Sequence, residues 1–201
     1  MILENYYWCY QSALSSHFCD ELVKYGESKK QKIGTTSGID EEDLQSKENL
    51  KKLHKVRNSN VTWINEPWVM RTITPWMQQA NGDANWNFEL LAHEEAQWTK
   101  YGKEQHYNWH YDSNHKAYDA PNFPYHNMIR KLSMTISLVD GTEYEGGDFQ
   151  VIIDGEEKTI NQARQKGTVT VFPSFVKHRV SPVKKGTRYS IVLWWCGNRF
   201  I

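Results

Sequence analysis

The stretch YGKEQHYNWHYD, residues 101–112, decides how the rest of this chain is interpreted. It ends in His110-Tyr111-Asp112, and on an extended strand successive side chains point to opposite faces. His110 and Asp112 therefore share one face, while Tyr111 points away from it. One imidazole and one carboxylate side by side hold a divalent metal only when a third ligand comes from elsewhere in the chain. Taken alone, the triplet is also typical of a surface strand end, so its interpretation depends on the remaining sequence.

The composition limits the class of protein. The 201 residues fit one domain, and 24 basic residues balance 24 acidic ones, which weighs against nucleic acid as a partner. The N-terminus lacks the basic and apolar regions of a signal peptide, and no run of about 18 apolar residues predicts a membrane span. The three cysteines lack metal-type spacing, so we expect buried thiols in a reducing compartment, here the cytoplasm. Nothing in the composition predicts an oligomeric state.

The first part of the chain predicts a strand and a helix, followed by a polar segment. Aromatic residues 6–10 favour a short strand, and Ser15 is a candidate N-cap. Apolar positions then recur at helical spacing as far as Gly26, which we expect to end the helix. Segment 27–60 carries runs of lysines and acidic residues. We interpret it as a solvated face or mobile loop in which a few leucines permit a helix.

A second strand and a second helix follow the polar segment. Residues 61–64 favour the strand, and apolar positions have helical spacing over residues 67–80. Pro75 is expected to kink or split this helix, because proline has no N–H to donate to the preceding turn. We expect the two helices to form a support layer behind a sheet.

The second half of the chain predicts a series of short strands separated by turns that contain glycine. This pattern is typical of a jelly roll, in which two sheets leave a mouth at one end. The expected fold class is α+β, mainly β: a cupin-like double-stranded β-helix with N-terminal supporting helices. We expect one domain over residues 1–201, with helical support over 1–84 and the jelly-roll core over 85–201. The predicted strands are 86–91, 95–101, 107–111, 131–139, 149–153, 168–172, 177–180 and 188–195.

His178 is the candidate third metal ligand, near the start of a late predicted strand. A lone histidine on a strand is more often structural than a ligand. A jelly roll, however, brings strands that are distant in sequence together at its mouth. With His110 and Asp112, His178 would complete a 2-His-1-carboxylate set, which leaves metal positions open as in non-heme Fe(II) oxygenases.

Arg188 is a candidate anchor for a dicarboxylate bound to such a metal. A dicarboxylate that chelates the metal by one end needs its far carboxylate held, and an arginine fork does this through two charge-assisted hydrogen bonds. Ser190 and Trp194 lie on the same strand face, where Ser190 can add a hydroxyl donor and Trp194 can wall the pocket. The alternative is a surface charge at a strand edge, but the apolar run 191–195 indicates that this strand is buried.

Several loose motifs occur in a specific order over roughly residues 95–197. They are Tyr107-x-x-His110-x-Asp112, Arg130-x-Leu132-Ser133, Gly146-Gly147-Asp148-Phe149, Phe172-Pro173-Ser174, His178-x-Val180 and Gly186-x-Arg188-x-Ser190. Through this ordered set the chain resembles the 2-oxoglutarate and Fe(II)-dependent dioxygenases, in their prolyl 4-hydroxylase-like branch. The N-terminal half is similar to that family in outline only.

The resemblance implies a role for each matching residue. The implied metal ligands and catalytic residues are His110, Asp112 and His178. Arg188 would bind the distal carboxylate of 2-oxoglutarate, helped by Ser190 and by Tyr101, although Tyr101 is equally well explained as a core tyrosine. The implied cofactors and cosubstrates are Fe(II), 2-oxoglutarate and O2, with ascorbate as a further candidate.

The resemblance also implies a reaction: hydroxylation of an unactivated C–H bond, coupled to decarboxylation of 2-oxoglutarate to succinate and CO2. A prolyl residue of a peptide or protein is the favoured substrate, and a free amino acid or other small molecule is the alternative. A non-catalytic, cupin-like metal-binding protein is the other alternative, but it has no need of a dicarboxylate anchor such as Arg188. Collagen-type members of the family use a lysine at this position, which argues against a collagen-like substrate.

The loop 113–129 directly follows the predicted ligand Asp112, so it starts at the mouth of the jelly roll. It is too long for a simple turn and carries aromatic residues and prolines. We therefore predict a lid that orders over bound substrate and shields the site from water, the alternative being a static loop packed on the sheet. The side chains expected to contact substrate are Trp109, Trp194, Tyr118 and Tyr125.

Overall fold

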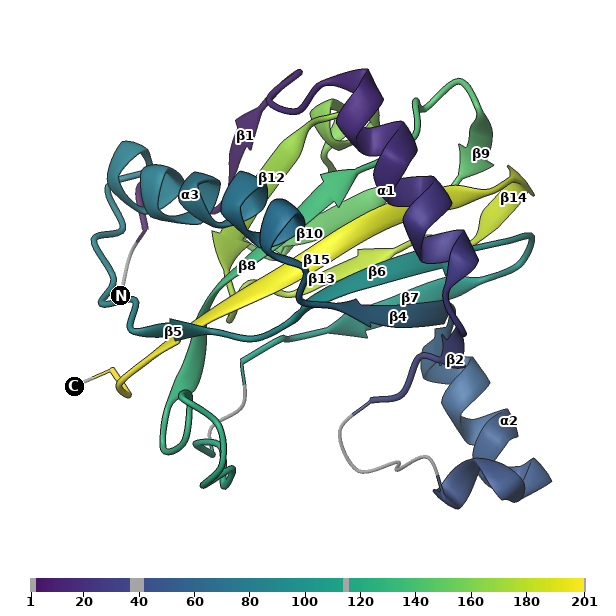
Figure 1. Cartoon of the computed structure of the whole chain (residues 1–201), viewed down its shortest axis with the longest axis horizontal. Helices are drawn as coiled ribbons and strands as arrows, with labels where there is room; N and C mark the ends of the chain where they lie inside the picture. Colours follow the sequence, from purple (N-terminus) through teal and green to yellow (C-terminus); the bar gives the residue numbers. More distant parts are fainter. Residues whose placement is uncertain (1–2, 37–41, 114–115, 201) are drawn as a thin grey trace.

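The computed structural model describes residues 3–36, 42–113 and 116–200 (Figure 1). Within these residues the chain is mainly antiparallel β-structure, with α-helices in its N-terminal half. Two sheets form the core, which confirms the predicted α+β, mainly β fold class and the double-stranded β-helix. Most of the strands predicted after residue 95 are present within a residue or two of the expected bounds, and β10 (Phe149–Ile153) coincides with its prediction.

The larger sheet carries the helices on one face. Helices α1 (Ser16–Ser28) and α3 (Pro67–Asp83) lie across it (Figure 1), and their apolar side chains share one buried cluster with those of its central strands. The strand order is β1-β12-β8-β15-β6-β4-β2, and β5 also pairs with β15. The bounds are β1 Trp8–Tyr10, β12 Val169–Pro173, β8 Ile129–Ser137, β15 Arg188–Gly197, β6 Ala96–Tyr101, β4 Asn60–Ile64, β2 Lys32–Ile33 and β5 Ala92–His93.

The smaller sheet closes the other side of the core. Its order is β11-β10-β13-β7-β3, and a separate pair joins β14 to β9. Phe149 and Val151 of this sheet pack against Phe172 of the larger sheet. The bounds are β11 Glu156–Thr159, β13 His178–Val180, β7 His106–His110, β3 Arg57–Asn58, β14 Val183–Gly186 and β9 Tyr144–Gly146; short 3-10 helices span Glu42–Gln45 and Asn161–Arg164.

The two faces of β15 have different chemistry. Ile191 and Leu193 are fully buried in the cluster beneath the helices. Arg188, Ser190 and Trp194 alternate with them, as expected for a strand, and line a pocket between the two sheets. The sequence prediction that these three side chains share an inward face therefore agrees with the structure.

The N-terminal 84 residues do more than provide helical support. They also contribute β1 and β4 to the larger sheet and β3 to the smaller one. The polar segment 27–60 contains α2 (Lys47–Val56), which is mostly exposed, as predicted for a solvated face, and is anchored by the fully buried Leu53. None of the helices in the described parts of the chain is long and apolar enough to cross a bilayer.

The predicted N-cap of α1 is confirmed, but its predicted end is wrong. The Ser15 hydroxyl accepts a hydrogen bond from the backbone N–H of Phe18 at 3.2 Å. The helix continues through Gly26 to Ser28. Gly26 is in the helix because Trp98 packs directly against it: a Cβ atom at this position would lie 2.2 Å from the indole ring.

Two further local predictions differ from the structure. Helix α3 is continuous through Pro75, so the proline does not split it. Residues 86–91 do not form a strand, because Asn85 and Asn87 adopt positive φ angles of 57° and 51° that turn the chain. The Trp86 indole N–H instead donates to the Asn5 carbonyl at 2.7 Å, and pairing with β15 begins only at β5.

We predict that Gly26→Ala destabilises the protein by about 1–3 kcal/mol, because the added methyl group overpacks the contact with Trp98. The matched control is Gly82→Ala near the end of α3, where an added Cβ meets no atom within 4 Å and alanine has the higher helix propensity. Denaturant unfolding should show a loss of stability for the first variant and no loss for the second. Equal stabilities would contradict the packing role of Gly26.

Candidate active site

Three side chains that the sequence suggested as metal ligands converge at one end of the pocket. His110 is the last residue of β7, His178 is the first of β13, and these two residues pair directly across the strands. Asp112 follows β7, and its backbone N–H donates to the Ser174 carbonyl at 3.0 Å. Potential ligand atoms of the three residues all lie within 4.8 Å of one another.

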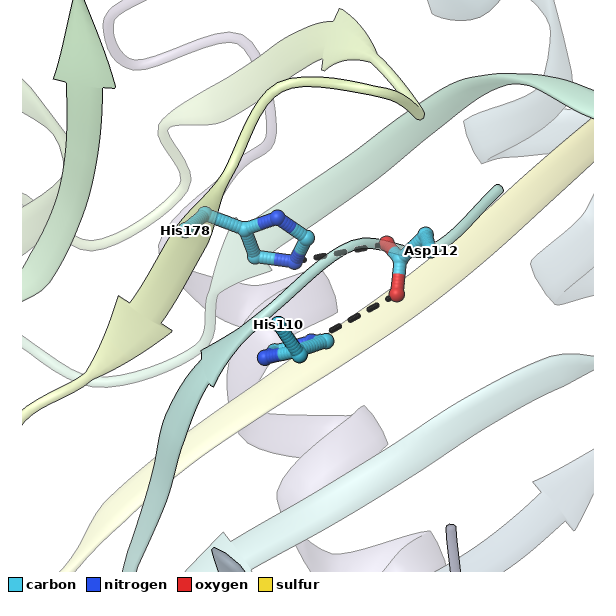
Figure 2. Close-up of side chains that lie close together, drawn as sticks. All are labelled: His110, Asp112 and His178. Atoms are coloured by element: carbon cyan, nitrogen blue, oxygen red, sulfur yellow. Dashed lines mark ion pairs between the residues drawn. The ribbon is translucent and has the colours of Figure 1, made fainter. Parts of the chain in front are cut away.

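Both imidazoles point toward the Asp112 carboxylate (Figure 2). The distances from Nε2 to the carboxylate oxygens are 3.5 Å for His110 and 3.4 Å for His178. The Nδ1 atom of His110 lies 2.7 Å from the Asn108 carbonyl, and that of His178 lies 2.9 Å from the Val176 carbonyl. Each Nδ1 therefore carries the proton, which leaves each Nε2 free as a metal donor.

The electrostatics of the cluster favour a bound cation. Burial alone would raise the pKa of Asp112, but attraction to His178 and hydrogen bonds from both histidines, which each can provide when its Nε2 also carries a proton, hold that pKa well below its usual value. Burial, followed by repulsion from His178, lowers the pKa of His110. An ionised carboxylate beside a neutral imidazole is the donor set that a divalent transition metal requires, so the three residues fit such an ion.

A one-residue bulge in β7 shapes the wall next to the cluster. Tyr107 pairs with Val180 and His110 pairs with His178, so β7 has two residues between the pairs where β13 has only one. The bulge places Tyr107 and His110 on the same face of the sheet. Their rings stack with centroids 3.5 Å apart and an angle of 10° between the planes.

Arg57 extends this stack from the neighbouring strand β3. It pairs with Tyr107 across the strands, and its guanidinium lies 4.6 Å from the centre of the Tyr107 ring. Although Arg57 belongs to the charged segment, it is only 6% exposed and lines the pocket. Arg57 was not predicted from the sequence, because a single arginine in a charged run carries no signal that β3 will pair with β7.

The opposite end of the pocket is built around Arg188. Its side chain is 2% exposed, and no carboxylate among the described residues forms an ion pair with it. Its Nη1 donates to the Ser190 hydroxyl at 3.0 Å, but its buried Nε has no partner. Tyr101 pairs with Arg188 across the strands, and its ring lies 5.5 Å from the guanidinium.

Other polar atoms in the same pocket are also without partners. The Thr99 hydroxyl and the Trp194 indole N–H are buried and make no hydrogen bond, and both residues line the pocket. Thr99 lies opposite Ser190 in the pairing of β6 with β15. Because a buried donor without an acceptor is costly, the Arg188 Nε and the Thr99 hydroxyl make their end of the pocket fit a ligand with several acceptor oxygens, such as a carboxylate.

A partly buried ion pair packs against Trp194. Arg130 binds Glu94 through two hydrogen bonds of 2.6 Å each, and its guanidinium lies 3.9 Å from the centre of the Trp194 ring. Since Arg130 is already neutralised by Glu94, it is a poor anchor for a ligand carboxylate. Trp63, which is 45% exposed, lies on the outer side of Trp194 with ring centroids 6.1 Å apart.

The other side chains predicted to contact substrate are placed differently. Trp109 faces the outer side of the smaller sheet, where Arg179 stacks on it at 4.5 Å, and does not line the pocket. Tyr118 and Tyr125 pack on each other in the loop, with ring centroids 5.2 Å apart. Trp194 is thus the member of this group that the structure brings to the pocket.

Residues 96–196, half of the chain, match the model of the 2OG-Fe(II) oxygenase superfamily. The chain belongs to this superfamily. Membership implies Fe(II), 2-oxoglutarate and O2 as metal and cosubstrates, and the residues at the two ends of the pocket fit the first two of these.

Curated relatives of this chain match over a shorter stretch. A PKHD-type hydroxylase of Alteromonas mediterranea is 33% identical over 97 residues, which are 47% of this chain and 40% of the relative. A PKHD-type hydroxylase of Synechococcus sp. (strain CC9605) is 35% identical over 88 residues, 44% of this chain and 35% of the relative. The matched region therefore spans less than half the length of these relatives.

Solved structures share the fold over nearly the whole chain. The viral collagen prolyl hydroxylase of Paramecium Bursaria Chlorella virus-1 superimposes with a TM-score of 0.67 and 20% identity, over 96% of this chain and 97% of that one. The Pseudomonas putida prolyl-4-hydroxylase gives 0.65 and 17%, over 98% and 95%. At these identities the likeness shows the common fold, including the N-terminal half.

The loop after Asp112 is attached to the rest of the protein by Tyr118. The Tyr118 hydroxyl donates to Glu94 at 3.0 Å, and its backbone exchanges hydrogen bonds with Asn127 and Met128. Residues 114 and 115 lie outside the described residues, so the start of the predicted lid is not placed. Whether the loop closes over substrate stays a prediction, and Tyr118 is the contact on which its docking depends.

We predict that Tyr118→Phe loosens the loop, because it removes a hydrogen bond to a charged group worth about 1.5–3 kcal/mol. Trypsin cleavage after Lys116 should become at least about tenfold faster, since cleavage follows the open population. Tyr125→Phe is the matched control, because its hydroxyl bonds to no other described residue. Equal cleavage of both variants and the wild type would show that Tyr118 does not hold the loop.

Proposed function

We propose that this protein is an Fe(II)- and 2-oxoglutarate-dependent dioxygenase that hydroxylates a prolyl residue of a peptide or protein, releasing succinate and CO2. The observation that carries the proposal is the pairing, in one pocket, of a His110–Asp112–His178 cluster with the buried and unpaired Arg188. A protein that only binds metal has no use for the second feature, because a buried guanidinium without an anion costs stability.

Each of these residues has a defined task in the proposed reaction. His110 and His178 bind Fe(II) through Nε2 and Asp112 binds it through a carboxylate oxygen, leaving the remaining positions for cosubstrates. Arg188, with Ser190 and Tyr101, holds the distal carboxylate of 2-oxoglutarate. The bound metal and cosubstrate supply the oxidative chemistry, while the chain fixes their orientation and keeps water out of the pocket.

Substrate enters, in this proposal, on the side of the pocket that Trp194 walls. Trp194 and the exposed Trp63 offer flat apolar surfaces suited to a proline ring. Tyr118, from the loop after Asp112, lies next to Arg130. The names of the curated relatives, which are hydroxylases, and of the structural neighbours, which are prolyl hydroxylases, support this substrate class. A free amino acid is the second candidate, on the same chemistry.

The proposal extends to the conditions of the reaction. Cys9, Cys19 and Cys196 are all free thiols, and burial raises the pKa of each, with that of Cys196 at about 12. Unreactive free thiols suit a reducing compartment, for which we propose the cytoplasm. We further propose that ascorbate supports turnover by keeping the iron in its Fe(II) state.

The test is succinate release with Fe(II), 2-oxoglutarate, ascorbate and a panel of prolyl peptides, free proline and single-stranded nucleic acid. We expect release to be stimulated by prolyl peptides, with a mass increase of one oxygen on proline. His178→Ala should lose turnover while its circular dichroism spectrum stays unchanged. If free proline is hydroxylated and prolyl peptides are not, the substrate is the second candidate, a free amino acid. Full activity of His178→Ala would refute the metal site.

A second prediction concerns the carboxylate end of the pocket. Arg188→Ala should weaken 2-oxoglutarate binding to the Mn(II)-loaded protein by at least about thirtyfold, the scale of a charged hydrogen-bonded pair left without its partner. Titration calorimetry measures this directly. An unchanged affinity would mean that another basic residue, with Arg57 the first to test, holds the carboxylate.

A third prediction tests whether the Thr99 hydroxyl also contacts 2-oxoglutarate. Thr99→Val and Thr168→Val each remove a buried hydroxyl that has no partner, so both should stabilise the ligand-free protein. Only Thr99 lines the pocket, so only Thr99→Val should weaken 2-oxoglutarate binding, by about five- to tenfold. If both variants bind 2-oxoglutarate as the wild type does, the Thr99 hydroxyl does not contact the cosubstrate.

A further inference from the structure

Two arginine–aromatic stacks flank strand β7, one on each face. Arg57 lies 4.6 Å from the centre of the Tyr107 ring on the pocket face. Arg179 lies 4.5 Å from the centre of the Trp109 ring on the outer face. The two contacts are closely similar in distance, so any difference in their roles comes from what surrounds them.

The outer stack ends at the protein surface. Arg179 donates to Gln150 at 2.7 Å and pairs with Glu157 at 2.8 Å, so a carboxylate already balances its charge. The Trp109 side chain makes no ring contact or hydrogen bond with the three candidate metal ligands among the described residues. This stack therefore packs the outer face of the sheet and has no link to the candidate metal ligands.

The inner stack continues to the metal cluster. The Tyr107 ring is nearly parallel to the His110 ring at 3.5 Å, and the His110 ring lies 4.1 Å from that of His178. The His110 ring is therefore held between two other rings. Its Nδ1 contact with Asn108 fixes the tautomer, whereas Tyr107 fixes the plane of the ring.

Arg57 is itself held rigidly. Its Nε, Nη1 and Nη2 donate to the Ser59 hydroxyl, the Thr35 carbonyl and the Gln97 side chain, at 2.9, 3.0 and 2.6 Å. All three acceptors are neutral, and no carboxylate among the described residues pairs with Arg57. The Arg57 guanidinium lies 4.6 Å from the centre of the Tyr107 ring, so the contact is a cation–π interaction.

We propose that Arg57 is a positioning residue for the metal centre: it clamps Tyr107 against His110 and so fixes the direction of the His110 Nε2 donor. The inference rests on the proposed function, because it assumes that the cluster binds a metal. Arg57 touches neither metal nor cosubstrate in this role. It couples the metal site to the segment around Thr35 and Ser59, which lies far from the cluster in sequence and otherwise belongs to the charged part of the chain.

The experiment is a titration of the full chain with Co(II). Calorimetry measures the Co(II) affinity, and the visible absorption of the bound ion reports ligand geometry independently of turnover. Arg57→Gln keeps a polar side chain but removes the charge, and Tyr107→Leu removes the ring. We expect each to weaken Co(II) binding by about tenfold, the lower end of the range for groups that orient metal ligands, and to change the visible spectrum. Tyr107→Phe keeps the stack and should behave as the wild type.

Arg179→Gln is the matched control, since it removes the equivalent arginine from the other face of β7. It should leave Co(II) affinity and spectrum unchanged. If both Arg57→Gln and Tyr107→Leu keep the wild-type Co(II) affinity and spectrum, the inference is wrong but the proposed function stands. The same holds if Arg57→Gln and Arg179→Gln lose equal Co(II) affinity. If Arg57→Gln does not fold, the comparison of Tyr107→Leu with Tyr107→Phe decides. Failure of the wild type to bind Co(II) would overturn the proposed function and the inference with it.

Discussion

The rest of the structure depends on the alternation of side chains along β15. One face of this strand must be apolar, because Ile191 and Leu193 pack beneath α1 and α3. The other face carries Arg188, Ser190 and Trp194 into the pocket. The helices therefore do more than fill a core: by requiring an apolar face, they fix which residues of β15 turn toward the metal cluster, since a shift of one residue would exchange the two faces.

A second constraint is the cost of buried charge. Arg188 and Arg57 are both almost fully buried in the same pocket, and neither has a carboxylate partner among the residues described. The neighbouring pair Arg130–Glu94 shows the usual solution, two short hydrogen bonds between opposite charges. Arg57 is stabilised by three neutral acceptors and a ring, whereas Arg188 keeps an unpaired Nε. That difference is consistent with the two proposed roles, in which Arg57 supports the site and Arg188 binds a carboxylate.

The sequence was sufficient wherever side chains follow strict strand or helix periodicity. The shared face of Arg188 and Ser190 follows from strand period. The strands after residue 95 follow from apolar runs between glycine turns, and the N-cap follows from the Ser15 hydroxyl ahead of a helical pattern. Predictions failed where a tertiary contact overrides the local signal. Gly26 is inside a helix because of Trp98, and residues 86–91 are not a strand because asparagines with positive φ turn the chain. Short edge strands such as β3 carry no periodic signal, so Arg57 could not be predicted.

The bulge in β7 shows why the aromatic neighbour of the cluster was harder to predict than the cluster itself. With strict alternation, Trp109 and Tyr107 would lie on one face and His110 on the other. The bulge places Tyr107 on the same face as His110 and leaves Trp109 alone on the outer face. One inserted residue thus brings an aromatic side chain next to the cluster, where strict alternation would place none from residues 107 and 109. The pair His110 and Asp112 lies after the bulge, so its expected convergence was not affected, and the same geometry gives His110 a ring that Arg57 can hold in place.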